Sequence, residues 1–296
     1  MKRVWTIDAE ASDYPGQLAD LDRLAPPVLH GVGQRDAVAA LDADATVTIV
    51  GSRRASAYGL GVAEQIAADL AASGATIVSG MALGIDAAAH RGALAGGGRT
   101  IAVLAGGPDV VYPARESGLY RRITTDQGAA ISEHPAGVRP QKADFPARNR
   151  IMAALARFVL IVEAAEPSGS LITARLAQGL GREVGAVPGQ VGTRVATGTN
   201  GLLRDGAAFV SGAQDILDRL AGVGSTSITR AGPPLDEGLL RALDLVERGA
   251  RTADELAVAA EAAPSWAAVA LAQLELLGYV KADSSGAYAR TTLTHP

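Results

Sequence analysis

Short apolar runs, separated by glycine-containing turns and helical stretches, repeat along the chain from about residue 46 to residue 220. The runs are mostly continuous rather than alternating, which is typical of strands buried on both faces of a parallel sheet. They read TVTIV, ATIVS, RTIAVLA, AAIS, FVLIVEA, EVGAVP and AFVSG. Between the first two runs, GLGVAEQIAADLAASG is apolar at a helical period and closes at Gly74, so it predicts a crossover helix. This pattern predicts an α/β fold with a Rossmann-like, doubly wound and mostly parallel sheet.

The pattern divides the chain into four parts. Residues 1–45 contain three prolines and are expected to form an N-terminal lead-in, irregular apart from a short edge element. Residues 46–221 form the Rossmann-like domain, and the small, polar and Pro-ended stretch 222–233 is expected to be a linker. In residues 234–296, three amphipathic helical stretches precede two short strand-like pieces, which predicts a small winged helix-turn-helix domain.

Composition narrows the possible chemistry. The chain of 296 residues has no cysteine, which excludes disulfides and thiolate metal sites, and its four histidines show no ligand spacing. We therefore expect no metal and no cofactor. No apolar run approaches membrane-spanning length and the N-terminus lacks the apolar stretch of a signal peptide, so the sequence predicts a soluble, cytoplasmic protein without a membrane partner.

Charge is unevenly distributed. The formal net charge of −4 argues against a uniformly basic nucleic-acid binder, so any such site must be local. Residues 234–296 carry nine acidic and five basic side chains, whereas residues 139–157 carry five basic side chains and one acidic side chain. Such a run is usually a solvated face, and the count alone leaves that reading and a binding role equally open.

The first predicted strand of the Rossmann-like domain ends in GSRRASAYGLG. Gly51 allows a sharp turn at the carboxyl end of the strand, where ligands bind in open parallel sheets, Ser52 offers a hydroxyl, and Arg53 and Arg54 offer guanidinium groups that bind phosphate. The spacing differs from GxGxxG and no acidic residue follows the second strand, which disfavours an NAD site.

The next strand ends in SGMALGIDAAAH, a second small-residue turn that includes Gly80 and opens a helix. Asp86 is better suited to cap the first turn of that helix than to act as a catalytic carboxylate. His90 lies four residues later on the same helix face, so a structural Asp–His pair is expected.

The basic run contains RPQKADFPARNR. Lys142 and Phe145 lie three residues apart in an expected extended segment, and a cation beside an exposed ring is the combination that holds a single strand. Phe145 could instead anchor the core. Arg148 and Asn149 open the next helix, where side chains and backbone N–H groups can point at an anion.

Two further turns complete the set. In EAAEPSGSLITA, Ser168, Gly169 and Ser170 again pair a small-residue turn with a helix N-terminus, and Asn200 lies in the later flexible loop GTNG. Glu163 is a lone acid at a strand end, and no second acid lies at a useful spacing. Because catalysis needs matched groups, the sequence predicts a protein that is not an enzyme.

Together these motifs resemble the DNA-processing protein A family (DprA, also called Smf). The matching strings are GSR, SGMALGID, VLAGGPDVVYP, ISEHP, KADFPARNRI, SGSLITA, VPG and GTNGLLRDGA, in order from about Tyr14 to Leu220. Members often carry a helical module before the Rossmann domain, for which the first 45 residues are too short, and Glu116 stands where the family usually has Asn.

The resemblance implies a homodimer that binds single-stranded DNA and helps load RecA recombinase during natural transformation. It also implies that Arg53 and Lys142 contact the strand, with Ser52 beside them, and that Phe145 stacks on a base.

Two other function classes remain as alternatives. Similar sheets bind nucleotide-like ligands in phosphoribohydrolases, but those enzymes use a PGGxGTxxE motif, and SGSLITARLAQ has no Glu at the matching place. A transcription regulator would read duplex DNA through the winged helix, but SWAAVALAQLELLG contains no Lys or Arg and is poorly suited to duplex phosphates.

Overall fold

The computed structural model describes residues 4–224, 230–282, 286–291 and 293–294. The chain divides into two compact units, unit 1 (residues 1–227) and unit 2 (residues 228–296). The strands of unit 1 are β1 (Trp5–Asp8), β2 (Val28–Gly33), β3 (Thr46–Val50), β4 (Thr76–Ser79), β5 (Thr100–Val103), β6 (Ala129–Ser132), β7 (Phe158–Ile161), β8 (Glu183–Ala186) and β9 (Ala208–Phe209). Its α-helices are α1 (Arg35–Ala39), α2 (Ala57–Ala72), α3 (Ile85–Ala95), α4 (Ser117–Thr125), α5 (Asp144–Leu155), α6 (Gly169–Gly179), α7 (Thr197–Arg204) and α8 (Ala213–Ala221). Short 3-10 helices are η1 (Gly16–Leu24), η2 (Ala43–Ala45), η3 (Ala114–Glu116) and η4 (Arg194–Ala196).

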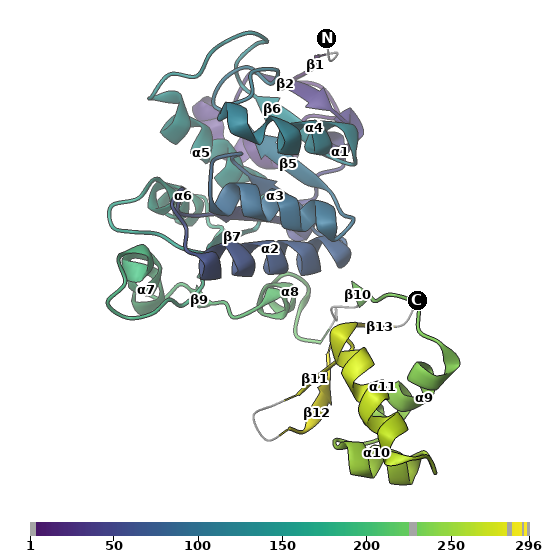
Figure 1. The fold of residues 1–296 in the computed structure, drawn as a ribbon. Coiled ribbons are helices and arrows are strands. Elements are labelled where there is room, and N and C mark those ends of the chain that lie inside the picture. The colour runs from purple at the N-terminus through teal and green to yellow at the C-terminus, as the bar shows by residue number, and fades with distance from the viewer. Residues whose placement is uncertain (1–3, 225–229, 283–285, 292, 295–296) are drawn as a thin grey trace. The chain divides into compact units, whose positions relative to one another are not determined.

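The strands of unit 1 form one nine-stranded sheet in the order β1-β2-β6-β5-β4-β3-β7-β8-β9 (Figure 1). Strands β3 to β9 pair in parallel, and β1 and β2 add an antiparallel edge. The predicted doubly wound, mostly parallel sheet is confirmed, and each of the seven apolar runs contains a strand. From β3 the chain builds outward through β4, β5 and β6, then returns to place β7 on the other side of β3, which makes the gap between β3 and β7 the switch point of the sheet.

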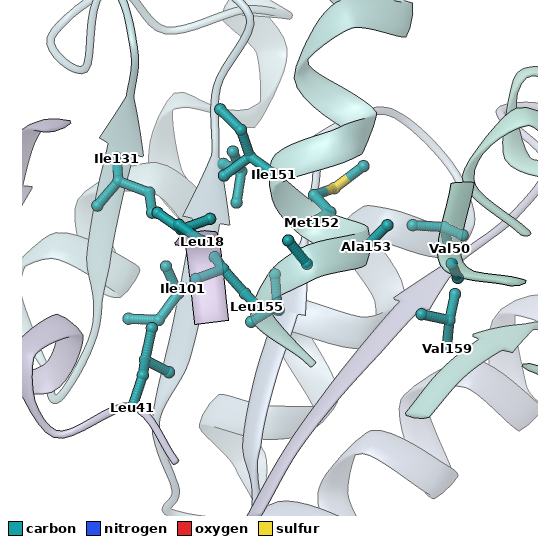
Figure 2. Packing of buried hydrophobic residues seen from close by; sticks show 14 of the residues in the cluster. Leu18, Leu41, Val50, Ile101, Ile131, Ile151, Met152, Ala153, Leu155 and Val159 are labelled. Atoms are coloured by element: carbon teal, nitrogen blue, oxygen red, sulfur yellow. The ribbon is translucent and has the colours of Figure 1, made fainter. Parts of the chain in front are cut away.

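Both faces of the sheet are covered. Helices α5 and α6, with η1, pack on one face, and the side chains of β3, β5, β6 and β7 point into the same cluster. Figure 2 shows Leu18 of η1 with Ile151 and Leu155 of α5 gathered over Ile101 and Ile131 of the sheet. Helices α3 and α4 pack on the opposite face, where α2 lies against α3 and α8 against α2. Burial on both faces explains why the strands read as continuous apolar runs.

The first 45 residues are more ordered than the expected lead-in. Strand β1 is the edge strand, β2 pairs with both β1 and β6, and Leu18, Leu21 and Leu29 are buried in the main core. Both pairings are antiparallel, and the one between β2 and β6 joins segments about 100 residues apart, so the local pattern gave little sign of it. The segment therefore belongs to the sheet and the core of unit 1.

Unit 2 holds α9 (Glu237–Glu247), α10 (Ala253–Ala259) and α11 (Pro264–Leu276), followed by the antiparallel hairpin β11 (Val280–Ala282) and β12 (Tyr288–Arg290). Three helices followed by a hairpin is the order of elements predicted for a small winged helix-turn-helix domain. Strand β10 (Arg230–Ala231) pairs in parallel with β13 (Leu293–Thr294), and Tyr279 Oη donates to Pro233 O at 2.6 Å. Residues 230–233 therefore pack on unit 2, although the linker was expected to continue to residue 233; residues 225–229 of that linker lie outside the described ranges.

In the described ranges no single helix is long and apolar enough to cross a bilayer, and α10 and α11 reach that length only as a pair bent by 116°.

Candidate nucleic-acid interface

A cavity of about 980 Å³ opens at the switch point of the sheet in unit 1. Val50 at the end of β3 and Ala165 beyond the end of β7 line it, together with residues from the first turns of α5 and α6. Carboxyl ends of parallel strands and helix N-termini both direct backbone N–H groups toward a bound anion. This cavity is called the switch-point pocket below.

The loop after β3 is fixed on two sides. Ser52 N donates to Glu163 O at 2.7 Å beyond β7, and Ile85 N at the start of α3 donates to Ser52 O at 3.2 Å. Gly51 is required here, because a Cβ at this position would lie 2.6 Å from Ile85 Cγ1. The clamped loop leaves Arg53 exposed at the pocket.

Two aromatic rings stand beside Arg53. The Arg53 guanidinium carbon lies 5.2 Å from the centroid of the Phe145 ring, within the range of a cation–π contact. The Tyr112 ring lies 5.4 Å from the Phe145 ring, with the two planes tilted by 55°. Phe145 is half-buried, whereas Tyr112 is 54% exposed, and both rings line the switch-point pocket.

Phe145 lies on a helix rather than in the expected extended segment. Helix α5 begins at Asp144, whose carboxylate accepts from Gln141 N at 2.7 Å. Pro146 is tolerated in the first turn because N–H groups there have no acceptor within the helix. Lys142 therefore lies just before the helix, exposed at the pocket, and the ring of Phe145 is held by the first turn.

Arg148 is buried beneath this surface, only 4% exposed. Its Nη1 donates to Gly80 O at 2.7 Å and to Val103 O, so it ties α5 to the ends of β4 and β5. Burial lowers the pKa of Arg148 to about 10; the nearby carboxylate of Asp86 opposes this shift and the positive charge of Arg53 adds to it. Burial also raises the pKa of Asp86, which is 5% exposed.

The first turn of α6 also lines the pocket. Ser168 caps the helix, its Oγ accepting from Ser170 N at 3.3 Å, and the two hydroxyls lie 2.8 Å apart. Asn149 Nδ2 donates to Gly169 O at 3.3 Å, which joins the first turns of α5 and α6. A Cβ at Gly169 would meet no atom within 4 Å, so this turn is open to the pocket.

Positive charge dominates the pocket. Five cations line it, namely Arg53, Arg54, Lys142, Arg148 and Arg194. Asp86 is the one acid among the lining residues. Within the described ranges no carboxylate lies within 4.0 Å of the charged nitrogens of these five side chains.

Glu163 and His90 have structural roles. Both oxygens of Glu163 accept from Ser56, the N-cap of α2, at 2.8 Å from its N–H and 2.5 Å from its hydroxyl. His90 is fully buried and its Nδ1 bonds with Thr100 Oγ1 at 2.7 Å, so the expected Asp–His pair is replaced by a pair with the neighbouring strand. Burial lowers the pKa of His90 to about 3. Among the described residues no group of three His, Asp or Glu side chains could hold a metal ion.

Comparison with known proteins identifies the family. A family model described as DNA recombination-mediator protein A matches residues 5–221. The chain belongs to this family. A DprA-type protein of Mycobacterium tuberculosis is 43% identical over 262 residues, which cover 86% of this chain and 66% of the relative. The chain thus spans just under two thirds of the length of that relative.

Two solved DprA structures share the fold. DNA processing protein A of Streptococcus pneumoniae superposes with a TM-score of 0.67 at 38% identity, covering 73% of this chain and 74% of the other. DNA processing protein A of Helicobacter pylori superposes with a TM-score of 0.66 at 32% identity, covering 74% and 98%. The latter structure concerns the single-stranded DNA binding mode of the Helicobacter protein.

Most of the residues predicted as the DprA-type site come together. Those that line the switch-point pocket are Gly51, Ser52, Arg53, Lys142, Phe145, Arg148, Asn149, Ser168, Gly169 and Ser170. They come from the loop after β3 and from the first turns of α5 and α6 with the residues just before them, which are distant in sequence. Their contact with DNA stays a prediction.

Two other predicted residues do not line the pocket. Gly80 lies behind Arg148, and a Cβ there would lie 2.4 Å from Arg148 Nη1, so this glycine makes room for the guanidinium. Asn200 uses both ends of its amide on Gly189, accepting from its N–H at 3.1 Å and donating to its carbonyl at 3.0 Å. Gly80 therefore supports a residue of the pocket, whereas Asn200 fixes the backbone of Gly189, which does not line it.

Sequence reasoning also missed pocket residues of this DprA-family chain. Tyr112 belongs to the VYP string that carries the resemblance, but no role was assigned to it. Arg194 lies in η4, after β8, and no pattern in its neighbourhood marks it as part of the site. For Tyr112 the sequence did offer one signal, an aromatic residue next to a proline in a string that matches the family. For Arg194 it offered none.

Proposed function

We propose that this protein is a recombination mediator that binds single-stranded DNA in the switch-point pocket without cutting it. One observation supports this most: five cations and two aromatic rings line one cavity that has a single, buried acid. Cations that follow a phosphate backbone and rings that stack on bases are the two components of single-strand binding.

The phosphates have two kinds of partner in this proposal. Arg53, Lys142 and Arg194 are exposed and bring positive charge to the pocket rim. The N-terminus of α6, at Gly169, adds the positive end of a helix dipole. Arg148 is too buried to reach far into the pocket, so we assign it to the positive potential of the pocket floor and to holding α5 in place.

In this proposal the bases stack on the aromatic rings of Phe145 and Tyr112. Phe145 contacts both Arg53 and Tyr112, so its ring is partly ordered in advance and needs less ordering when a base stacks on it. Tyr112 is the more exposed ring and offers a second stacking surface. Bases in a duplex are already stacked and paired, so this arrangement favours an unpaired strand.

The carboxylates favour binding over catalysis. Glu163 is engaged by Ser56, and Asp86 accepts from Ala82 N at 3.3 Å in a buried position. Neither has the matched, accessible partner that general acid–base chemistry needs. This supports the proposal that the protein is not an enzyme, against the phosphoribohydrolase alternative.

Membership of the recombination-mediator family supports a finer proposal. The protein would act in the cytoplasm as a homodimer and help load RecA recombinase on incoming single strands during natural transformation. RecA assembly on strands coated with a single-strand-binding protein tests this: we expect faster assembly when this protein is added. Unchanged RecA assembly would contradict the loading role, and a monomer in sedimentation would contradict the homodimer.

The experiment for DNA binding is a titration of a labelled oligonucleotide of about 20 nucleotides, single-stranded or annealed, by fluorescence anisotropy. We expect the single strand to bind at least about tenfold tighter than the duplex, with an affinity that falls steeply with salt because cations displace counterions. Equal affinity for the two forms, or loss of full-length oligonucleotide on incubation, would refute the proposal.

A further inference from the structure

Arg148 joins three elements of unit 1 beneath the switch-point pocket. It lies on α5, and its Nη1 donates to Gly80 O just after β4 and to Val103 O at the end of β5. Strand β5 leads into the loop that carries Tyr112, and α5 carries Phe145 one turn before Arg148. The same guanidinium therefore connects the two elements from which the aromatic pair comes.

The guanidinium of Arg148 has little left to offer a phosphate. The residue is 4% exposed, its Nη1 is occupied by two carbonyls, and its Nε is buried without a hydrogen-bond partner. Asp86, the one acid among the lining residues, is buried near enough to attract its charge. Because a charge-assisted hydrogen bond needs an accessible N–H group, the contacts of Arg148 favour a structural connection over a direct one to the strand.

The ring of Phe145 depends on where the first turn of α5 lies. A spacing of three residues places Phe145 and Arg148 on one side of the helix. The ring centroid lies 5.4 Å from that of Tyr112 and 5.2 Å from the Arg53 guanidinium carbon, so a shift of the turn by about 1 Å would alter both contacts. Lys142 is exposed and its long side chain can follow such a shift, whereas a stacked ring cannot.

We propose that Arg148 is a positioning residue, which contributes to strand binding by placing Phe145 against Tyr112 rather than by its own charge. This inference rests on the proposed function, because it concerns how bases are held in the same pocket. The position that Arg148 gives to α5 then outweighs its share in the positive potential of the pocket floor.

The test compares an oligonucleotide of about 20 nucleotides with an abasic strand of equal length, which keeps the phosphates but has no bases to stack. Arg148→Lys retains the charge and removes the guanidinium that bridges Gly80 O and Val103 O. We expect its affinity for the base-bearing strand to fall at least about fivefold and its affinity for the abasic strand to change by less than about twofold. The salt slope should stay unchanged, since the phosphate contacts remain.

Gly80→Ala tests the same role with Arg148 in place. A Cβ at Gly80 would lie 2.4 Å from Arg148 Nη1 and 2.6 Å from its Cζ, so it displaces the guanidinium and leaves the charge. The same base-dependent loss is expected, and wild-type binding in this variant would contradict the proposal.

Arg182→Lys is the matched control. Arg182 Nη2 donates to Ala154 O at 3.0 Å and so holds the far end of α5, away from the rings. This variant should change neither affinity by more than about twofold. Thermal denaturation fixes a temperature at which all the compared chains are folded.

A double-mutant cycle shows whether Arg148 acts through the ring. In the Phe145→Ala background, Arg148→Lys should lower affinity by less than about twofold further, because no ring is left to place. Equal losses with and without the ring, or on base-bearing and abasic strands, would overturn the proposal. Unchanged affinity of Arg148→Lys would also overturn it, and a loss with a shallower salt slope in Arg148→Met would then identify charge as the contribution. These patterns leave the proposed function intact, whereas a wild-type chain that binds no single strand would refute both.

Discussion

The switch-point pocket of unit 1 and the small pocket of unit 2, where α10 turns into α11, differ in the charge of the residues that line them. Five cations line the pocket against one buried acid, whereas Asp254 and Glu261 are the charged residues in the lining beside α11. The net charge of −4 for the whole chain does not reflect the local charge at either pocket. The comparison teaches that the local charge of each unit is set by the side chains that its fold leaves unpaired, rather than by the overall balance.

Reversing a pocket cation should give the largest effect. Arg53→Glu removes a guanidinium from the rim, removes the cation–π contact with Phe145 and places a carboxylate where a phosphate would lie. We expect single-strand affinity to fall at least about 100-fold. Arg122→Glu, on the exposed side of α4 and outside the pocket lining, is the matched control and should change affinity by less than about threefold. Comparable losses in the two variants would mean that overall charge, and not the pocket, holds the strand.

The aromatic pair should give the next largest effect. Phe145→Ala should cost about 1–3 kcal/mol of binding free energy if a base stacks on the ring, and Tyr112→Ala should cost less because that ring is less firmly held. The loss should disappear with an abasic oligonucleotide of equal length, since that strand has nothing to stack.

Thermal denaturation separates stacking from a packing role. Phe145 is half-buried, so removal of its ring can also destabilise unit 1. A lowered Tm with unchanged affinity would show that Phe145 is a core residue, which would leave the pocket with cations alone.

Lys142 and Arg157 belong to the same basic run but differ in what they contact. Lys142 is exposed at the pocket, whereas Arg157 Nη1 lies 2.7 Å from Asp44 Oδ1, an ion pair at the far end of α5. Lys142→Gln should lower single-strand affinity about three- to tenfold and reduce the salt slope by about one, while Arg157→Gln should leave both unchanged. Equal effects in titrations over a range of salt would mean that charge density alone matters.

The same pair shows what could be predicted from the sequence. A count of charges along residues 139–157 indicated a basic surface, but the fold divides that run among different tasks. Arg150 is paired with Glu133 at 2.7 Å, Arg157 is paired with Asp44, and Arg148 is buried, so few of these cations remain for a ligand. Charge patterning along a chain carries no information on ion pairs between distant segments, which form only on folding.

The sheet was far more predictable than the first 45 residues. Strands β3 to β9 carry their own signal, because burial on both faces demands continuous apolar runs. Strand β2 reads VLHGVG and is interrupted by His30 and Gly31, and its place beside β6 depends on pairing across about 100 residues. A Cβ at Gly31 would lie 2.1 Å from the Trp5 ring, so this glycine records a cross-strand contact that the local sequence does not reveal.

The residues that line the switch-point pocket also differ in how well the sequence predicts them. Residues in turns after strands, such as Ser52 and Ser168, were predictable because carboxyl ends of parallel strands meet at one edge of the sheet. Arg194 and Tyr112 reach the pocket from longer loops, whose course depends on packing rather than on a repeating pattern. Asn200 carried the signal of a binding loop, although its amide is used to fix the backbone of Gly189.

Deleting residues 228–296 should give the smallest effect and tests whether the two units act independently. Every residue that lines the switch-point pocket lies in unit 1, which has its own core, so single-strand affinity at about 150 mM salt should stay within about threefold of the full chain. At about 10 mM salt, where charges interact over roughly 30 Å, loss of the more acidic unit should tighten binding slightly. A collapse of affinity in a truncated chain that still melts cooperatively would place part of the strand on unit 2. That result would contradict the independence of the two units, because the more acidic unit 2 would then have to contribute to binding a polyanion.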